Sequence, residues 1–138
     1  MKRILLTNLA VVLFATAVTS AHHSHAMFDG SVVTEITGTL VNVRYANPHV
    51  YLRIEAAQRD GKPLNPPQTW AIEMSTTVNM QQRGITPAIL KVGKPISVKV
   101  NPLFSGGFSG NYTSVVMIDG VKNAANGAEW KPVRAGAR

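Results

Sequence analysis

The histidines are the residues of this 138-residue chain best suited to chemistry, and they fall into two clusters. His22, His23 and His25 stand together near the N-terminus, and His49 follows an Asn-Pro pair further along the chain. Imidazole nitrogens bind copper, zinc and nickel, and tetragonal nitrogen sites favour Cu(II). We therefore predict a transition-metal site built from these four histidines, with copper as the preferred ion and zinc or nickel less favoured.

The processing of the N-terminus decides how much of this site exists. Residues 1–21 begin with a short basic region, continue with an apolar stretch and end in small residues, a pattern typical of a secretory signal peptide. Cleavage after Ala21 would leave His22 as the first residue, whose α-amine and ring nitrogen can chelate one ion. Cleavage after Ala17 or Ala26 also fits the small-residue rule, and the latter would discard three of the four histidines. We favour Ala21 and expect a periplasmic protein with no membrane anchor after processing.

Two neighbours of the N-terminal cluster extend the metal hypothesis. The Met27 thioether could serve Cu(I), and the Asp29 carboxylate could orient an imidazole. Each has a structural alternative, because Met27 can pack with Phe28 and Asp29 can belong to an ordinary turn. The histidines have alternatives too: the leader can lack any fixed partner, and His49 can donate to a backbone carbonyl at a strand edge.

Catalytic motifs are scarce in the remainder of the chain. The absence of cysteine excludes disulfides, thiolate metal sites and thiol chemistry. No nucleophile elbow, phosphate loop or dinucleotide fingerprint occurs. Glu35, Glu55 and Glu73 fall at outward strand positions, where carboxylates are expected to be solvated. We therefore favour a binding protein over an enzyme, and an oxidative copper enzyme that uses an N-terminal histidine is the third hypothesis.

The charge of the chain is positive but dispersed. Fourteen Lys and Arg against seven Asp and Glu give a formal net charge of +7. Removal of residues 1–21 takes Lys2 and Arg3 with it, so the mature charge is 12 − 7 = +5. Because no run of like charges occurs, we expect a solvated basic surface and no nucleic-acid partner.

Alternating apolar residues predict the first half of the domain as three strands. The first runs from about residue 32 to 45, and a phase change at Leu40-Val41, close to Gly38, predicts a bulge that bends it. The second runs from His49 to about residue 56. Residues 63–67 are expected to form a rigid loop before a third strand at residues 70–74, with Trp70 facing inward.

The second half predicts one short helix and two further strands. Ser75 or Thr76 can cap a helix that Gly84 ends, and strands follow at residues 96–100 and 112–118. This order predicts an all-β fold with one short helix, a small five-stranded OB-like Greek-key barrel, with an open β-sandwich as the alternative. The expected organisation is a signal peptide (1–21), a His-rich leader (22–30), a β-barrel domain (31–120) and a basic flexible tail (121–138).

Aromatic residues support a second binding hypothesis. Tyr51, Trp70, Phe104 and Phe108 could form the ligand face of a metal-independent OB-like module that holds a small molecule, a glycan or a protein partner. Trp70 also fits the alternating core pattern of its strand, so a core position is the competing interpretation for that residue.

Several short motifs resemble those of a family of small exported bacterial proteins, the domain-of-unknown-function family 6152. They are His-His-Ser at 22–24, Phe-Asp at 28–29, Gly38, Asn-Pro-His at 47–49, Trp70, Glu-Met-Ser at 73–75 and Arg-Gly at 83–84. The chain departs from the family pattern at Tyr45, where tryptophan is frequent, and at His25, where an aromatic residue is frequent. The resemblance implies an exported β-rich domain, and it implies no substrate.

Overall fold

The computed structural model describes residues 25–123 and Trp130. The predicted signal peptide, together with His22 and His23, lies outside the described residues, as does most of the predicted tail. In the part of the chain that is described, no helix combines the length and the apolar character needed to cross a membrane.

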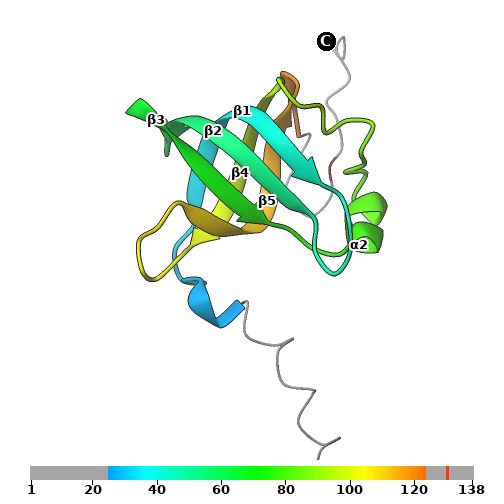
Figure 1. The fold of residues 1–138 in the computed structure, drawn as a ribbon, viewed down its shortest axis with the longest axis horizontal. Helices are drawn as coiled ribbons and strands as arrows, with labels where there is room; N and C mark the ends of the chain where they lie inside the picture. The colour runs from blue at the N-terminus through cyan, green and yellow to red at the C-terminus, as the bar shows by residue number, and fades with distance from the viewer. Residues whose placement is uncertain (1–24, 124–129, 131–138) are drawn as a thin grey trace, which may run out of the picture.

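The described residues form six strands, one short α-helix and one 3-10 turn (Figure 1). The all-β class with one short helix is confirmed. In chain order the elements are η1 (His25–Met27), β1 (Thr34–Arg44), β2 (Tyr51–Arg59), β3 (Lys62–Glu73), α2 (Thr77–Gln82), β4 (Pro95–Pro102), β5 (Ser109–Ile118) and β6 (Val121–Lys122).

The strands make one sheet that closes on itself. The order is β3-β2-β1-β4-β5-β6, and an additional pairing of β3 with β5 completes a ring. The neighbours within that order are antiparallel, whereas the closing contact is parallel and short, with residues 71–73 beside 109–111. The five long strands and the helix after β3 follow the predicted order, and β6 is a two-residue addition. A single closed sheet excludes the open-sandwich alternative.

The interior of the ring is filled by one face of each strand. Because side chains alternate along a strand, every second residue reaches the core. Trp70, at 0% exposure, is the largest of these, and Met80 and Ile85 close the core from α2 and the loop that follows it. The other fully or nearly fully buried apolar residues include Ile36, Leu40, Val50, Leu52, Ile54, Ile72, Met74, Ile96, Val98 and Val100.

The predicted bulge in the first strand is confirmed. The register between β1 and β2 shifts between Thr37 and Gly38 and again between Leu40 and Asn42. The two strands approach closely at this point, since a Cβ added to Gly38 would lie 2.1 Å from the carbonyl oxygen of Glu55. Only glycine allows this approach, so Gly38 is part of the bend that lets β1 pair with both β2 and β4.

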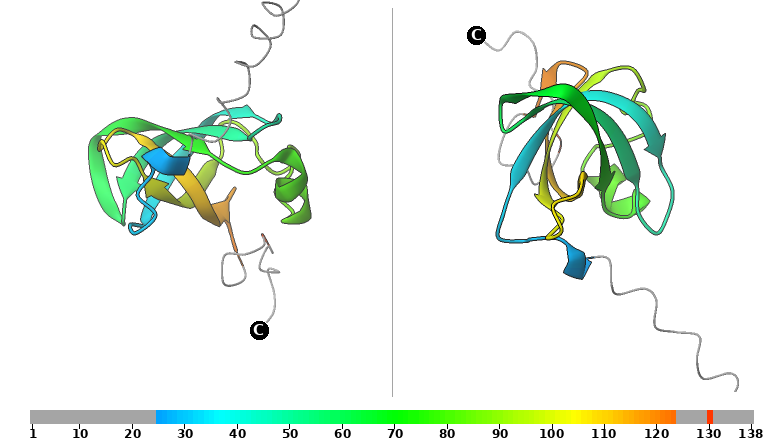
Figure 2. Two further views of the ribbon diagram at one scale, coloured as in Figure 1. Left: turned by 90° about the horizontal axis from the view of Figure 1, so that it is seen from below. Right: turned by 60° about the vertical axis from the view of Figure 1, so that its left-hand side comes forward.

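One boundary prediction was wrong, and two other segments include ordered residues that the sequence did not indicate. Residues 63–67 form part of β3, where they extend the hairpin with β2 beyond the expected loop. The predicted flexible tail begins with β6, and Trp130 is buried against the core with its backbone N–H donating to the Arg83 carbonyl. The described part of the leader is also fixed, because Phe28 is buried and bridges to Leu103 beside the β4–β5 loop (Figure 2).

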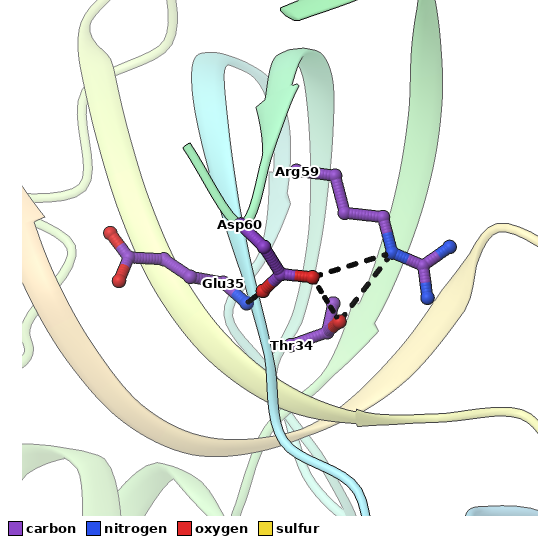
Figure 3. A network of polar contacts seen from close by, with 4 residues as sticks. All are labelled: Thr34, Glu35, Arg59 and Asp60. Atoms are coloured by element: carbon purple, nitrogen blue, oxygen red, sulfur yellow. Dashed lines mark hydrogen bonds and ion pairs between the residues drawn. The ribbon is translucent and has the colours of Figure 1, made fainter. Parts of the chain in front are cut away.

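A polar network ties the β2–β3 turn to β1 (Figure 3). The Asp60 carboxylate accepts hydrogen bonds from the Glu35 backbone N–H at 2.8 Å and from the Thr34 hydroxyl at 2.9 Å. Asp60 adopts a left-handed φ of 51°, which short polar side chains tolerate. The network holds the far end of the hairpin, away from the histidines.

Candidate functional site

His49 lies at a corner that hydrogen bonds hold on both sides. Before it, the Asn47 side-chain oxygen accepts hydrogen bonds from the Thr77 backbone N–H and hydroxyl, at 3.1 and 3.0 Å. After it, the Val50 N–H donates to the Ser75 carbonyl. The Asn-Pro-His corner is therefore pinned to the start of α2 and to the chain that leaves β3. This leaves the His49 ring partly exposed, with 25% of the side chain accessible.

Glu73 ends β3 on the outer face of the sheet. It is directly opposite Tyr51 on β2 and beside Asn111 on β5, so these three side chains form a row across the closing seam of the ring. Glu73 faces outward, as the alternation predicted, but the prediction that its carboxylate is solvated is wrong. Glu73 is only 6% exposed because its neighbours in the row and the His49 ring enclose it.

His25 reaches the same place from the leader. Its 3-10 turn is followed by the buried Phe28, and the Asp29 N–H donates to the Pro102 carbonyl at 2.8 Å. These contacts hold the turn against the end of β4. The His25 Nδ1 lies 3.1 Å from the Asn111 side-chain nitrogen, and the His25 ring stands edge-on to His49 with centroids 6.1 Å apart.

His25, His49 and Glu73 can each present one ligand atom so that all three atoms lie within 4.8 Å of one another. Ligands about 2.1 Å from a tetrahedral ion are roughly 3.4 Å apart, so a small inward movement of the exposed His25 ring would complete three-coordinate binding. The ring is free enough for that movement, since His25 is exposed on the surface. The geometry therefore fits a metal ion with two imidazole ligands and one carboxylate ligand.

The Glu73 carboxylate is buried in contact with His49. Its Oε1 lies 2.7 Å from the His49 Nδ1, within ion-pair distance. The same Oε1 is buried and accepts no well-aligned hydrogen bond among the described residues, so proximity alone joins the two atoms. A buried carboxylate oxygen without an aligned donor is costly unless a proton or a cation compensates it.

The Glu73 carboxylate also affects the pKa of Tyr51. Burial raises the pKa of the Tyr51 phenol, the charge of Glu73 and a hydrogen bond to it raise it further, and Arg44 partly opposes the shift. The Arg44 guanidinium lies 5.9 Å from the Tyr51 ring centre. Tyr51 therefore remains a neutral hydrogen-bond donor beside Glu73, a role that orients the carboxylate.

A pocket of about 220 Å³ opens beside the two histidines. The lining combines the imidazoles with polar groups from β5, from the chain after β3 and from Arg83, which directly follows α2. The lining residues are His25, His49, Met74, Ser75, Arg83, Asn111 and Tyr112. A metal ion held by the three ligands would face this pocket, with coordination positions open to it.

Of the predicted metal ligands, the structure brings His25 and His49 together. Sequence reasoning missed Glu73, although its place in the Glu-Met-Ser motif at 73–75 was noted. Asp29 takes its alternative role as part of a turn, whereas the exposure of Met27 does not fit its expected packing with Phe28. The Met27 side chain is exposed, and Asp29 accepts hydrogen bonds from the Ser31 N–H and hydroxyl, so it caps a turn.

The predicted aromatic ligand face is not continuous. Trp70 is fully buried and therefore belongs to the core, as the competing interpretation held. Phe108 lies over one side of it, with ring centroids 6.0 Å apart, and Phe104 is exposed on the same loop. Tyr51 belongs instead to the row that contains Glu73.

A comparison with family models places the chain among related sequences. The model described as a family of unknown function, DUF6152, matches residues 10–115. No curated protein and no solved structure matches the chain.

Proposed function

The chain belongs to this family of unknown function, and from its site we propose that it is an exported periplasmic protein that binds a transition-metal ion through His25, His49 and Glu73. The observation that carries the proposal is the convergence of two imidazoles and one buried carboxylate from three separate parts of the chain. Glu73 is only 6% exposed, and its Oε1 accepts no aligned hydrogen bond among the described residues, so a cation beside it would stabilise the buried carboxylate.

The ligand set favours a first-row transition metal over magnesium or calcium, because imidazole suits copper, zinc, iron and nickel. Among divalent ions the affinity of such a site rises to copper and then falls at zinc. We therefore expect Cu(II) to bind most tightly in solution.

The predicted signal cleavage would complete the site. Cleavage after Ala21 gives His22 a free α-amine three residues before His25. The amine and ring of His22, with His23 nearby, would supply further nitrogen ligands to the same ion. Cleavage after Ala26 would instead remove His25 and leave only His49 and Glu73. The intact mass of the protein recovered from periplasm tests both the export and the cleavage position.

Isothermal titration of the processed protein with Cu(II) tests the site. We expect one tight site per chain, and His49→Ala should weaken it at least tenfold, whereas Asn42→Ala, an exposed substitution on β1, should not change it. Equal affinity in the His49→Ala protein would show that the leader alone chelates the ion. A His23→Ala variant separates leader chelation from binding by the three described ligands.

A metal-independent binding module remains the second candidate. The observation that favours it is the exposure of Met27, Phe104 and Phe108 around the β4–β5 loop, at 51%, 68% and 49%. A protein partner or small ligand seated there would perturb Trp70, which Phe108 covers. Fluorescence of a Trp130→Phe variant reports Trp70 alone, and a ligand response that persists in chelator would favour this function.

A further inference from the structure

The pocket beside the histidines lacks acidic groups among its described lining residues. It is instead surrounded by hydrogen-bond donors, of which Arg83 carries a permanent positive charge. We propose that this pocket binds a small oxyanion, of the carboxylate or phosphate class, as an additional ligand of the bound metal ion. The inference rests on the proposed metal-binding function, because the anion would be shared between the metal ion and Arg83.

The backbone of Arg83 is held by hydrogen bonds, while its side chain forms no ion pair with any described residue. Its N–H donates to the carbonyls of Asn79 and Met80 at the end of α2, and its carbonyl accepts from the Trp130 N–H at 2.8 Å. The half-buried guanidinium lies 5.8 Å from the Tyr112 ring centre. Among the described residues no carboxylate forms an ion pair with it. A half-buried guanidinium fixed over an aromatic ring is preorganised for an oxygen anion.

The other polar groups of the pocket can add donors. The Ser75 hydroxyl accepts a hydrogen bond from the Asn79 side chain at 2.8 Å, so its own hydrogen remains available to donate. The Asn111 amide nitrogen carries two hydrogens, and among the described residues it contacts the His25 Nδ1, which leaves one hydrogen to donate. Glu73, the nearest acid, lies against His49 and does not line the pocket.

The size of the pocket limits the anion. Its volume of about 220 Å³ is below the roughly 300–1,000 Å³ of pockets that hold drug-sized ligands. A glycan chain or a peptide segment is therefore too large to enter, whereas a small carboxylate or inorganic phosphate fits. The anion would occupy a coordination position that the three protein ligands leave open.

The test is a titration of the Cu(II)-loaded full processed chain with inorganic phosphate and, separately, with acetate. Visible absorption of the copper ion reports direct coordination, and chloride at equal ionic strength is the reference. We expect a saturable spectral change with at least one of the two oxyanions. Arg83→Gln should weaken that binding at least tenfold, and Arg83→Lys should retain part of it. The matched control is Arg53→Gln, an exposed arginine on β2 outside the pocket.

The outcomes separate this inference from the proposed function. If Cu(II) does not bind, the proposed function fails and the anion site fails with it. If Cu(II) binds but neither oxyanion changes its spectrum, or Arg83→Gln and Arg53→Gln respond alike, the anion site is wrong and metal binding stands. Equal oxyanion affinity of the metal-free protein would overturn the sharing of the anion between metal and arginine. Melting curves of both variants without metal verify that they fold.

Discussion

The substitution Glu73→Gln separates the metal role of this residue from its role in the fold. It keeps the shape of the side chain and removes the formal charge. In the metal-free protein the substituted amide can still hydrogen-bond to the His49 ring, which is one-quarter exposed, so this contact does not depend on the carboxylate charge. We therefore expect the free energy of unfolding without metal to change by no more than about 1 kcal/mol, or to rise slightly.

The effect with metal should be much larger. A ligand that binds only the folded state stabilises it by RT ln(1 + [L]/Kd), which is about 2.7 kcal/mol at a free ion concentration of 100 times Kd. If loss of the carboxylate weakens binding 100-fold, the same concentration stabilises the variant by only about 0.4 kcal/mol. The difference of about 2.3 kcal/mol corresponds to roughly 9–18 °C in melting temperature for a domain of this size.

Thermal unfolding by circular dichroism, with and without Cu(II) or Zn(II), measures both quantities. Glu55→Gln is the matched control, because Glu55 is an exposed carboxylate on β2. The control should show the full metal-induced rise in melting temperature. A full rise in the Glu73→Gln protein would refute a ligand role for Glu73. A loss of more than about 3 kcal/mol without metal would show that the carboxylate is primarily structural.

Three further predictions concern the scaffold, each measured by chemical denaturation. Gly38→Ala should lower the free energy of unfolding by about 1–3 kcal/mol or more, because its new methyl group would clash with the Glu55 carbonyl oxygen. An unchanged denaturation midpoint would contradict this. Asp60→Ala removes two hydrogen bonds at the hairpin end and should cost about 1–2 kcal/mol, whereas no loss would mean that water replaces them. Burial raises the pKa of Tyr45, so the neutral phenol contributes to the free energy of unfolding. That contribution is fully present below about pH 10, the usual tyrosine value, and is lost as the pH rises through the raised folded-state pKa. Tyr45→Phe should therefore lower the free energy of unfolding by about 0.5–1.5 kcal/mol at neutral pH, through loss of the hydrogen bond to the Ile85 carbonyl. It should also reduce the loss of stability at alkaline pH. An equal loss in both proteins would show that Tyr45 is not the group responsible.

The closed sheet was predictable because its physical signals are local. Alternation of apolar residues marks the inner face of each strand, and a break in that alternation near Leu40 marks the bulge. The strand at residues 63–67 was not predictable in this way. Four of its five residues are exposed and three are prolines, so neither burial nor propensity indicates a strand there. Pairing with β2 at Lys62 and Pro63 and again from Gln68 onward includes this segment in β3.

The candidate site was predictable only in part, since its ligands converge through tertiary structure. Histidine is rare enough in this chain that its two clusters suggested a shared site. Glu73 carries no such signal, because its outward position is the same as that of the exposed Glu55. What distinguishes Glu73 is its place opposite Tyr51 and beside Asn111 at the seam, which depends on the register of three strands.

The position of the site gives the metal proposal a structural consequence. The ring closes through a parallel contact of only three residues on each strand, the shortest pairing among the five long strands. Glu73 is the last of those residues on β3, His49 precedes β2, and His25 belongs to the leader that packs beside β4. An ion held by all three would connect the leader to both sides of the hairpin at this seam. Its binding free energy would then act on closure of the sheet itself, which is why melting temperature is a direct readout of occupancy.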